Sequence, residues 1–391
     1  MVERTLIGDG LAVGDDLRTA VEHAVASALS PFAGSRPDLV FAFVSGGRPE
    51  ESADALRHAA DLAGARNSVG CTAHGVIAAG RGVEGAVSVS VWAARLPSVS
   101  VRAFHLEVLR TPENIAVLGM PDRHDSDVVS VLLADPWSFP ADGFVDHSHA
   151  SLRGLPIVGG LASGTERAGE TRLMVDGHVH ERGAVGVVLG GALSVHPVVS
   201  QGCRPIGRPM TVTKVDGDTI LELAGLSALL QAKDAVSLLA EHEQPLAVRG
   251  LHLGLVIDEY AEEHEQGGFL VRGIAAADHH SGSLSVGERV EVGSTVQFLL
   301  RDAEAADDDL VQVLSALRSG IGLEGLAGAL LFSCNSRGRA MFPTPDHDVV
   351  AVRDGLGIEN VAGFFAAGEF GPVAGRNHVH GSAATVLAFG S

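Results

Sequence analysis

Apolar and polar positions follow one another along the chain in blocks that predict helices interleaved with buried strands. Continuous apolar runs at Leu39–Ser45 and Asp127–Ala134 are typical of strands that are buried on both faces. Apolar residues recur every three or four positions in Asp15–Ala28 and Pro49–Ala63, which predicts helices there. The class that we expect is therefore α+β, with two mixed domains whose sheets are largely antiparallel or mixed.

Two predictions concern connections later in the chain. Strands around Leu173 and at Gly183–Leu189 are expected to form a hairpin about the turn Asp176-Gly177. Three aspartates predict the start of a helix at Asp307–Arg318, because carboxylates favour the positive end of a helix.

One short pattern, an aliphatic residue followed by Gly-x-x-Ala-x-Gly, occurs three times in the chain. Its copies are Val69–Gly75, Val158–Gly164 and Ala362–Gly368. Each copy is followed within a few tens of residues by an apolar strand. This echo of strand, glycine turn and strand predicts a duplicated supersecondary unit.

Composition narrows the class of protein further. The chain has 391 residues, 46% of them hydrophobic, which is enough for two ordinary domains with a large core. Aromatic residues make up only 4%, which argues against recognition of stacked bases. The formal charge of −20 makes nucleic acid and anionic membranes poor partners.

Cysteine usage and the apolar segments bear on the compartment. Cys71, Cys203 and Cys334 are odd in number and have no CxxC spacing, so we expect neither a disulfide framework nor a zinc site. The N-terminus lacks the apolar segment of a signal peptide. The uncharged segment Gly183–Cys203 contains glycines and a proline, which favours two buried strands over a membrane span. A reducing cytoplasm is the predicted location.

The candidate chemistry is concentrated in Leu330–Pro372. Two apolar runs in this stretch end in glycines beside Cys334, Arg337 and Glu369. Arg337 can bind a carboxylate through two hydrogen bonds, and Glu369 can accept an ammonium group, which together suit an α-amino acid. The alternative is a buried structural ion pair between the two loops.

Cys334 has two interpretations. A thiol between a strand and Arg337 can have a lowered pKa and act as a nucleophile or redox sensor. Such a cysteine can also be a small buried apolar side chain. Cys71 lies in the equivalent place of an earlier copy of the pattern, close to His74.

Metal sites, nucleotide sites and serine-hydrolase sites are disfavoured because the sequence lacks the motifs that they require. Histidines occur in HxH pairs such as His178-x-His180 and His378-x-His380, without a third ligand at a recognisable spacing, so no metal is predicted. The chain has no GxGxxG after a strand, no P-loop and no GxSxG elbow, so no nucleotide cofactor or serine hydrolase is predicted.

Several blocks of the sequence resemble the FIST family, and they stand in that family's order. The blocks are Ser68–Gly75 with Gly85–Trp92, GCRPIGRP at Gly202–Pro209, LLFSCNSRG at Leu330–Gly338 and GFFAAGEFGP at Gly363–Pro372. The likeness covers about Pro37–Phe389. It implies an N-terminal extension with a helix at 1–36, a FIST-N domain at 37–215 and a FIST-C domain at 216–391.

The resemblance implies an intracellular sensory module that binds a small polar ligand, with amino acids as candidates, and that passes its signal to an unidentified partner protein. The family brings no settled catalytic residues, so we do not expect an enzyme. Two alternatives stay open: a thiol-dependent hydrolase or transferase acting on a small amide or thioester through Cys334, and a module that docks a partner's peptide. The predicted ligand contacts are Cys71, His74, Cys334, Arg337, Gly338, Glu369, Phe370, Gly371, Asn377 and His380.

Overall fold

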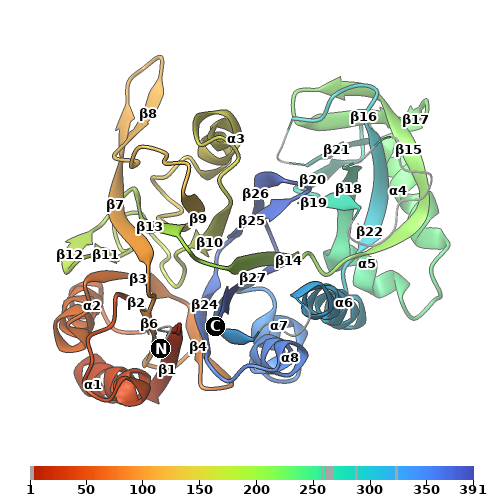
Figure 1. The fold of residues 1–391 in the computed structure, drawn as a ribbon. Helices are drawn as coiled ribbons and strands as arrows, with labels where there is room; N and C mark the ends of the chain where they lie inside the picture. Colours follow the sequence, from red (N-terminus) through yellow and green to blue (C-terminus); the bar gives the residue numbers. More distant parts are fainter. Residues whose placement is uncertain (1–3, 258, 260–267, 287–288, 322–324) are drawn as a thin grey trace. The chain divides into compact units, whose positions relative to one another are not determined.

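The computed structural model describes residues 4–257, 259, 268–286, 289–321 and 325–391. These residues form eight α-helices and 27 strands in mixed and antiparallel sheets, which confirms the α+β class (Figure 1). The chain divides into two compact units, Met1–Val199 with Val313–Ser391, and Ser200–Gln312. None of the described helices is long and apolar enough to cross a membrane.

The larger unit contains three copies of one arrangement, which we call the first, second and third repeats. In each repeat a central strand pairs in parallel with a second strand and antiparallel with the last strand of the repeat. Helices lie between the two parallel strands in the chain, as a parallel pair requires. The central strands are β2 (Leu39–Ser45), β9 (Asp127–Ala134) and β23 (Leu326–Cys334); the helices α2 (Pro49–Ala63), α3 (Ala141–Ser151), and α7 (Gly338–Met341) with α8 (His347–Leu356); the second strands β3 (Asn67–Ala73), β10 (Ile157–Leu161) and β24 (Val361–Ala366); and the last strands β6 (Ser88–Arg95), β13 (Ala184–Gly191) and β27 (Ala384–Gly390).

Each repeat also begins with a strand that pairs with its own last strand. In the third repeat the smaller unit of the chain follows this first strand directly, so it is an insertion in that repeat. The first strands are β1 (Leu6–Val13), β7 (Val99–Arg110) and β14 (Val195–Ser200); β1 is followed by α1 (Leu17–Leu29) and the short 3-10 helix Ser30–Phe32, and β7 by β8 (Ile115–Leu118).

A hairpin follows the second strand of each repeat and pairs with a different repeat. The hairpin of the first repeat joins the third, that of the second joins the first, and that of the third joins the second. The exchange closes into a cycle, so the larger unit has pseudo-threefold symmetry. The hairpins are β4 (Gly75–Ala78) with β5 (Arg81–Glu84), β11 (Leu173–Val175) with β12 (His178–His180), and β25 (Glu369–Val373) with β26 (Arg376–His380).

The structure explains the repeated glycine pattern in physical terms. Gly70, Gly159 and Gly363 occupy the same position on β3, β10 and β24, each opposite a residue of the parallel central strand. A Cβ atom at these positions would lie 2.3, 1.9 and 1.7 Å from the carbonyl oxygen of that neighbour. Only glycine fits so close an approach. The predicted internal echo is therefore confirmed.

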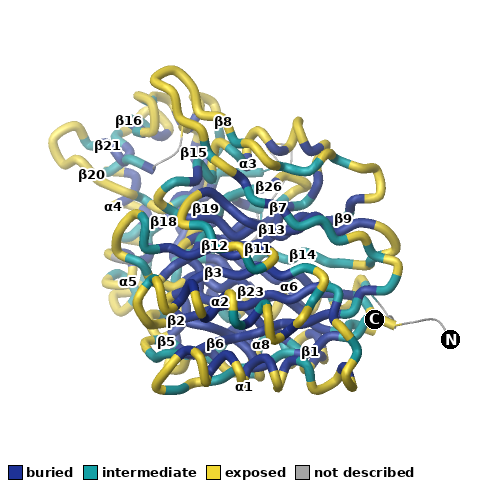
Figure 2. Tube along the Cα trace, turned by 90° about the vertical axis from the view of Figure 1, so that its left-hand side faces the viewer, coloured by how far each residue is buried: buried dark blue, intermediate teal, exposed yellow. Residues whose placement is uncertain are grey.

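The core explains why the central strands are apolar throughout. Alternate residues of β2 face opposite ways. Phe41 and Phe43 belong to a cluster to which all three repeats of the larger unit contribute, whereas Val40 and Ala42 pack with α1 and α2. Phe43 of the first repeat contacts Phe364 of the third with ring centroids 4.9 Å apart. Figure 2 shows these strands as continuous buried segments.

The smaller unit has its own sheet and its own core. The sheet order is β19-β18-β22-β15-β16-β21-β20, with β17 paired to β16. Apolar residues of β15, β16, β18 and β22 pack with helices α4 and α5. Its elements are β15 (Arg204–Asp216), β16 (Thr219–Leu223), β17 (Leu226–Ser227), α4 (Ala228–Ser237), α5 (Gln244–Gly250), β18 (Leu251–Val256), β19 (Phe269–Gly273), β20 (Ala276–Asp278), β21 (Ser283–Ser285) and β22 (Thr295–Leu300).

Two local predictions were wrong. The turn at Asp176-Gly177 joins β11 to β12, whereas β13, the predicted partner strand, pairs with β7 and β9. Helix α6 (Ala303–Ile321) begins before the three aspartates, because the Asp302 carboxylate accepts a hydrogen bond from the Ala305 amide at 2.8 Å and caps it.

Candidate functional site

The strand ends of the third repeat bring together the two halves of the predicted site. The chain leaves β23 at Cys334, and the Cys334 amide donates a hydrogen bond to the Ala383 carbonyl at 2.9 Å. The next amide, of Asn335, donates to the Ala366 carbonyl at the end of β24, at 2.8 Å. Glu369 opens β25 just beyond that strand. The parallel pairing of β23 with β24 therefore delivers Cys334 and Glu369 to one edge of the sheet.

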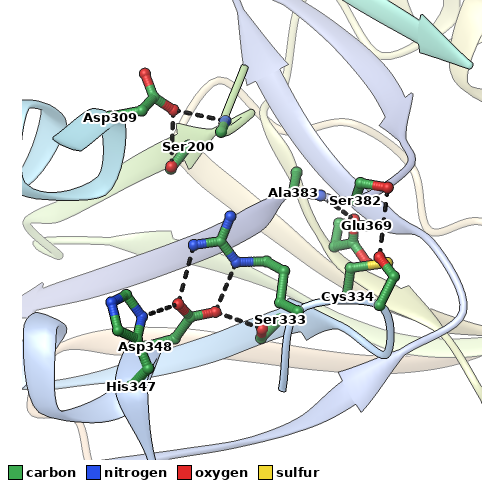
Figure 3. A network of polar contacts seen from close by, with 12 residues as sticks. Ser200, Asp309, Ser333, Cys334, His347, Asp348, Glu369, Ser382 and Ala383 are labelled. Carbon is green, nitrogen blue, oxygen red and sulfur yellow. Dashed lines mark hydrogen bonds and ion pairs between the residues drawn. The ribbon is translucent and has the colours of Figure 1, made fainter. Parts of the chain in front are cut away.

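Four side chains at this edge form what we call the thiol–carboxyl cluster: Cys334, Ser336, Glu369 and Ser382. Figure 3 labels Cys334, Glu369 and Ser382. The Ser336 hydroxyl donates to Cys334 Sγ at 3.0 Å and lies 3.4 Å from the Ser382 hydroxyl. The Ala383 amide donates to Glu369 Oε2 at 3.0 Å. The two serines are half-buried, whereas the thiol and the carboxyl lie beneath the surface.

Glu369 is fully buried, which is rare for a carboxyl group. Burial, and then the neighbouring Cys334 thiol, raise the pKa of Glu369 well above its ordinary value, and the hydrogen bond from the Ala383 amide only partly offsets them. Among the described residues, Oε1 has no hydrogen-bond partner other than that thiol. The side chain is thus a buried carboxyl group with one oxygen anchored by a hydrogen bond.

Arg337 is also fully buried, but its carboxylate partner is Asp348 of α8. Its Nε and Nη2 donate to the two oxygens of Asp348 at 2.7 and 2.9 Å, and Ser333 and His347 bond the same carboxylate. Burial works to raise the pKa of Asp348, but the charge of Arg337 and these hydrogen bonds outweigh it and lower that pKa. The guanidinium expected to bind a ligand carboxylate is therefore held by the protein.

The backbone at the cluster is strained at one residue. Ser382 has φ of +74°, in the left-handed region that side-chain-bearing residues rarely adopt. Such strain costs about 1–3 kcal/mol and is found preferentially at functional sites. This conformation places the Ser382 hydroxyl beside that of Ser336.

Pseudo-symmetry gives Glu369 two counterparts. In each repeat the residue that follows the close-approach glycine pairs with one residue of the exchanged hairpin, which is Glu369, Val76 or Leu173. All three side chains are fully buried. The fold accepts an aliphatic side chain at this position in two of its three copies, so packing alone does not require a carboxyl group there.

Two residues at the end of β23 can be compared with their counterparts in the same register. Ser333, which bonds Asp348, corresponds in register to Val44 and Ala134. Cys334 corresponds to Ser45 of the first repeat. The strand end is thus polar in both of these repeats, whereas at the hairpin position of Glu369 the other two repeats have Val76 and Leu173.

The remaining predicted contacts from the first repeat lie near this edge or in the core. The Glu84 carboxylate accepts a hydrogen bond from the Arg339 amide at 2.8 Å, beside Gly338, and lies 3.8 Å from the half-exposed His74 ring. Cys71 is fully buried in the core between the sheets, and burial raises the pKa of its thiol far above the ordinary range. Cys71 therefore lines the core rather than this edge.

The predicted contacts after Glu369 serve the packing of β25 and β26. Phe370 packs in the core beneath α3, and an added Cβ on Gly371 would lie 2.4 Å from Val199. The Asn377 amide bonds the Ile157 amide and the Leu155 carbonyl at 2.8 and 2.9 Å. His380 stands opposite Glu369 in the hairpin, with its Nε2 3.1 Å from the Gly371 carbonyl oxygen.

The sequence interpretation missed Ser336, Ser382 and Asp348. Asp348 carried a signal in the sequence, since it stands on the same helix face as the apolar residues Val349 and Val352. The structure shows that this face is buried, Asp348 included. Ser382 carried none, because a left-handed serine cannot be recognised from residue type. The HxH pairs His178-x-His180 and His378-x-His380 were named from the sequence only as disfavoured metal sites; the structure places them on the outer strands of equivalent hairpins, β12 and β26.

Family models match nearly the whole chain: the FIST N domain over residues 38–226 and the FIST C domain over 225–372. The predicted limits at residues 36 and 215 stay predictions. An uncharacterized protein of Mycobacterium tuberculosis strain H37Rv is 42% identical over 98% of this chain and 99% of its own length. One of Mycobacterium bovis is 40% identical over 98% of both.

Two solved structures of cyanuric acid hydrolases align along the chain at low similarity. One has a TM-score of 0.35 and 8% identity, covering 99% of this chain and 100% of the other. The second, from A. caulinodans, has a TM-score of 0.28 and 11% identity over the same shares. A likeness this distant says nothing about catalysis.

Proposed function

The chain belongs to the FIST family, and from this premise we propose that it is a sensory protein that binds a small polar ligand at the thiol–carboxyl cluster. The ligand contacts are the side chains of Cys334, Ser336, Glu369 and Ser382. An amino acid remains the first candidate, and a separate signalling protein would read the bound state. In the part of the chain that the structure describes, Cys71, Cys203 and Cys334 form no disulfide, which fits a reducing cytoplasm.

One observation carries the proposal: a buried carboxyl occupies a position that is Val76 and Leu173 in the other repeats. Burying an ionisable group is unfavourable, and replacing it by an aliphatic residue of the right shape is often neutral or stabilising. A chain that keeps the carboxyl therefore keeps it for a role other than stability. Ligand contact is the role that suits a group beneath two half-buried hydroxyls.

Arg337 has a positioning role in this proposal. Its bond to Asp348 fixes the loop that carries Cys334 and Ser336, because the guanidinium and the thiol are only three residues apart. The ligand meets the loop rather than the guanidinium.

The test is a thermal-shift screen against amino acids and central metabolites, repeated with two variants. Glu369→Val places the first repeat's side chain in the third, and Leu173→Val is the matched control at the equivalent position. We expect a ligand that stabilises the wild type and the Leu173→Val protein but not the Glu369→Val protein. A ligand that stabilises all three equally would show that binding does not use Glu369.

A second candidate function, thiol-dependent hydrolysis or transfer through Cys334, is favoured by the same geometry. The Ser336 hydroxyl donates to Sγ, and the Glu369 carboxyl is the group beside the thiol that can exchange its proton. Iodoacetamide labelling followed by mass spectrometry tests it, with the buried Cys71 and Cys203 as internal controls. Labelling of Cys334 at neutral pH, lost in Glu369→Val, would favour chemistry over binding.

A further inference from the structure

We propose that Glu369 meets its ligand as a hydrogen-bond donor, so that the ligand presents an oxygen acceptor, a carbonyl or a carboxylate, and not an ammonium group. This inference rests on the proposed function and names the chemical class that the cluster takes. It reverses the role that the sequence suggested for Glu369.

The two carboxyl oxygens of Glu369 have different surroundings. Oε2 accepts the hydrogen bond of the Ala383 amide at 3.0 Å, so this oxygen is the acceptor end of the group. A proton on the carboxyl then belongs to Oε1. Among the described residues, Oε1 has no partner other than the Cys334 thiol. A protonated Glu369 thus has one fixed oxygen and one O–H that faces the cluster.

Several elements pack around Glu369, and each brings a different group beside it. On β23 the neighbour is the Cys334 thiol, which disfavours the carboxylate. On β26 the facing residue is His380, whose Nε2 lies 3.1 Å from a carbonyl oxygen. On β10 the partner is Gly160, which carries no charge. Arg337 is the cation within electrostatic reach, and Asp348 neutralises it through two hydrogen bonds.

The protonated form of Glu369 follows from these surroundings. The group is fully buried, and no described residue forms an ion pair with it. Burial disfavours the charged form of a carboxyl, so its pKa is raised and the acid form extends toward neutral pH. A neutral carboxylic acid cannot attract an ammonium ion, but it donates a strong hydrogen bond to an oxygen acceptor.

The rest of the cluster is compatible with an oxygen acceptor. The hydroxyls of Ser336 and Ser382 lie 3.4 Å apart, and both residues are half-buried. The Ser382 hydroxyl carries one proton that can be donated to a ligand oxygen, whereas the Ser336 proton is donated to Cys334 Sγ. The strained backbone of Ser382 holds this donor in place.

The experiment uses three small probes of different charge: acetone as a neutral acceptor, acetate as an anionic acceptor and methylammonium as a cationic donor. Binding to the full chain is followed through the backbone amide resonances of Ser336, Ser382 and Ala383. The variants are Glu369→Gln, whose amide nitrogen still donates a hydrogen bond, and Glu369→Val, which cannot. Melting temperatures of both variants establish that they are folded.

We expect acetone, acetate or both to shift these resonances in the wild type and in Glu369→Gln, and to lose at least tenfold in affinity in Glu369→Val. Acetone binding to the wild type should weaken as the pH rises through the pKa of Glu369, whereas Glu369→Gln should show no such loss. Comparing acetone with acetate separates a carbonyl ligand from a carboxylate.

Binding of methylammonium in place of the acceptors, or loss of acceptor binding in Glu369→Gln, would overturn the donor role while leaving the ligand site intact. Shifts from none of the three probes would instead count against the proposed function itself. The two failures are therefore distinguishable.

Discussion

The first and third repeats share one backbone arrangement but treat its interior differently. At three equivalent positions the first repeat has Val44, Val76 and Ser45, and the third has Ser333, Glu369 and Cys334. The first set needs only packing and one hydroxyl contact, from Ser45 to the His74 carbonyl at 3.0 Å. The second set needs a buried network that extends to Arg337 and Asp348.

This difference distinguishes the side chains that the fold needs for packing from those that packing does not explain. Side chains that are aliphatic in one repeat and ionisable in another cannot all be explained by packing. The glycines opposite the central strands, by contrast, recur in every repeat because the backbone contact is the same. The comparison therefore associates the recurring glycines with stability, and it sets Glu369 apart as the residue for which ligand contact is proposed.

The largest effect on this comparison should come from breaking the buried pair of the third repeat. Asp348→Ala leaves the Arg337 charge buried without its carboxylate, so we expect a loss of about 3–5 kcal/mol in the free energy of unfolding. Urea denaturation measures it. The double variant Arg337→Met/Asp348→Leu, which removes both charges, should recover most of the loss, and a double variant as unstable as the single would contradict this account.

The same pair gives a pH dependence whose sign can be worked out. Because the pKa of Asp348 is lowered in the folded state, the pair contributes stability above the ordinary value of 3.8, and this contribution is lost as the pH falls below it. The double variant should lack that part of the acid sensitivity.

A smaller effect is expected from the feature that all repeats share. Gly363→Ala forces a Cβ to 1.7 Å from the Leu331 carbonyl oxygen, so the strands must separate, at a cost of about 1–3 kcal/mol. Gly143→Ala in α3 is the control, because a Cβ there meets open space and alanine favours a helix by up to about 1 kcal/mol. Equal melting temperatures for the two variants would refute the close-approach explanation.

Glu369 should show the opposite pH dependence to Asp348. Its pKa is raised in the folded state, so its contribution is greatest at low pH and stability declines as the pH rises above the ordinary value of 4.5. Glu369→Gln should flatten this decline, and Glu369→Val should be at least as stable as the wild type at neutral pH. Denaturation midpoints between pH 4 and pH 9 measure it. A variant that is less stable at every pH would make Glu369 a structural residue.

The smallest effect should come from the strained serine. Ser382→Gly relieves a left-handed conformation, and we expect a gain of up to about 1 kcal/mol, reduced by the greater chain entropy of glycine. Ala374→Gly, at φ of +49°, is the control for strain relief away from the cluster. Both should stabilise the protein, but only Ser382→Gly should weaken ligand binding. An unchanged affinity in Ser382→Gly would exclude its hydroxyl from the site.

Several features of the protein could be read from the sequence because they depend on local patterns. Continuous apolar runs identified β2 and β9, and helical periodicity identified α2, each with the bounds that the structure has. The repeated glycine pattern identified the duplication, because in each copy a glycine is required where the neighbouring strand's carbonyl oxygen leaves no room for a Cβ atom. Cys334 and Glu369 were also named as candidates from the sequence, since both follow apolar runs closely in the chain.

What only the tertiary structure decided was which group each side chain meets. Arg337 is paired with Asp348, eleven residues further along and on a helix, and not with the carboxyl that the sequence placed beside it. The exchange of hairpins between repeats, which makes Val76 and Leu173 the counterparts of Glu369, joins segments more than 90 residues apart. The residue type states which chemical group is available. Whether that group is charged depends on its burial and on its partners. Both are set by contacts between distant segments, which no local sequence pattern encodes.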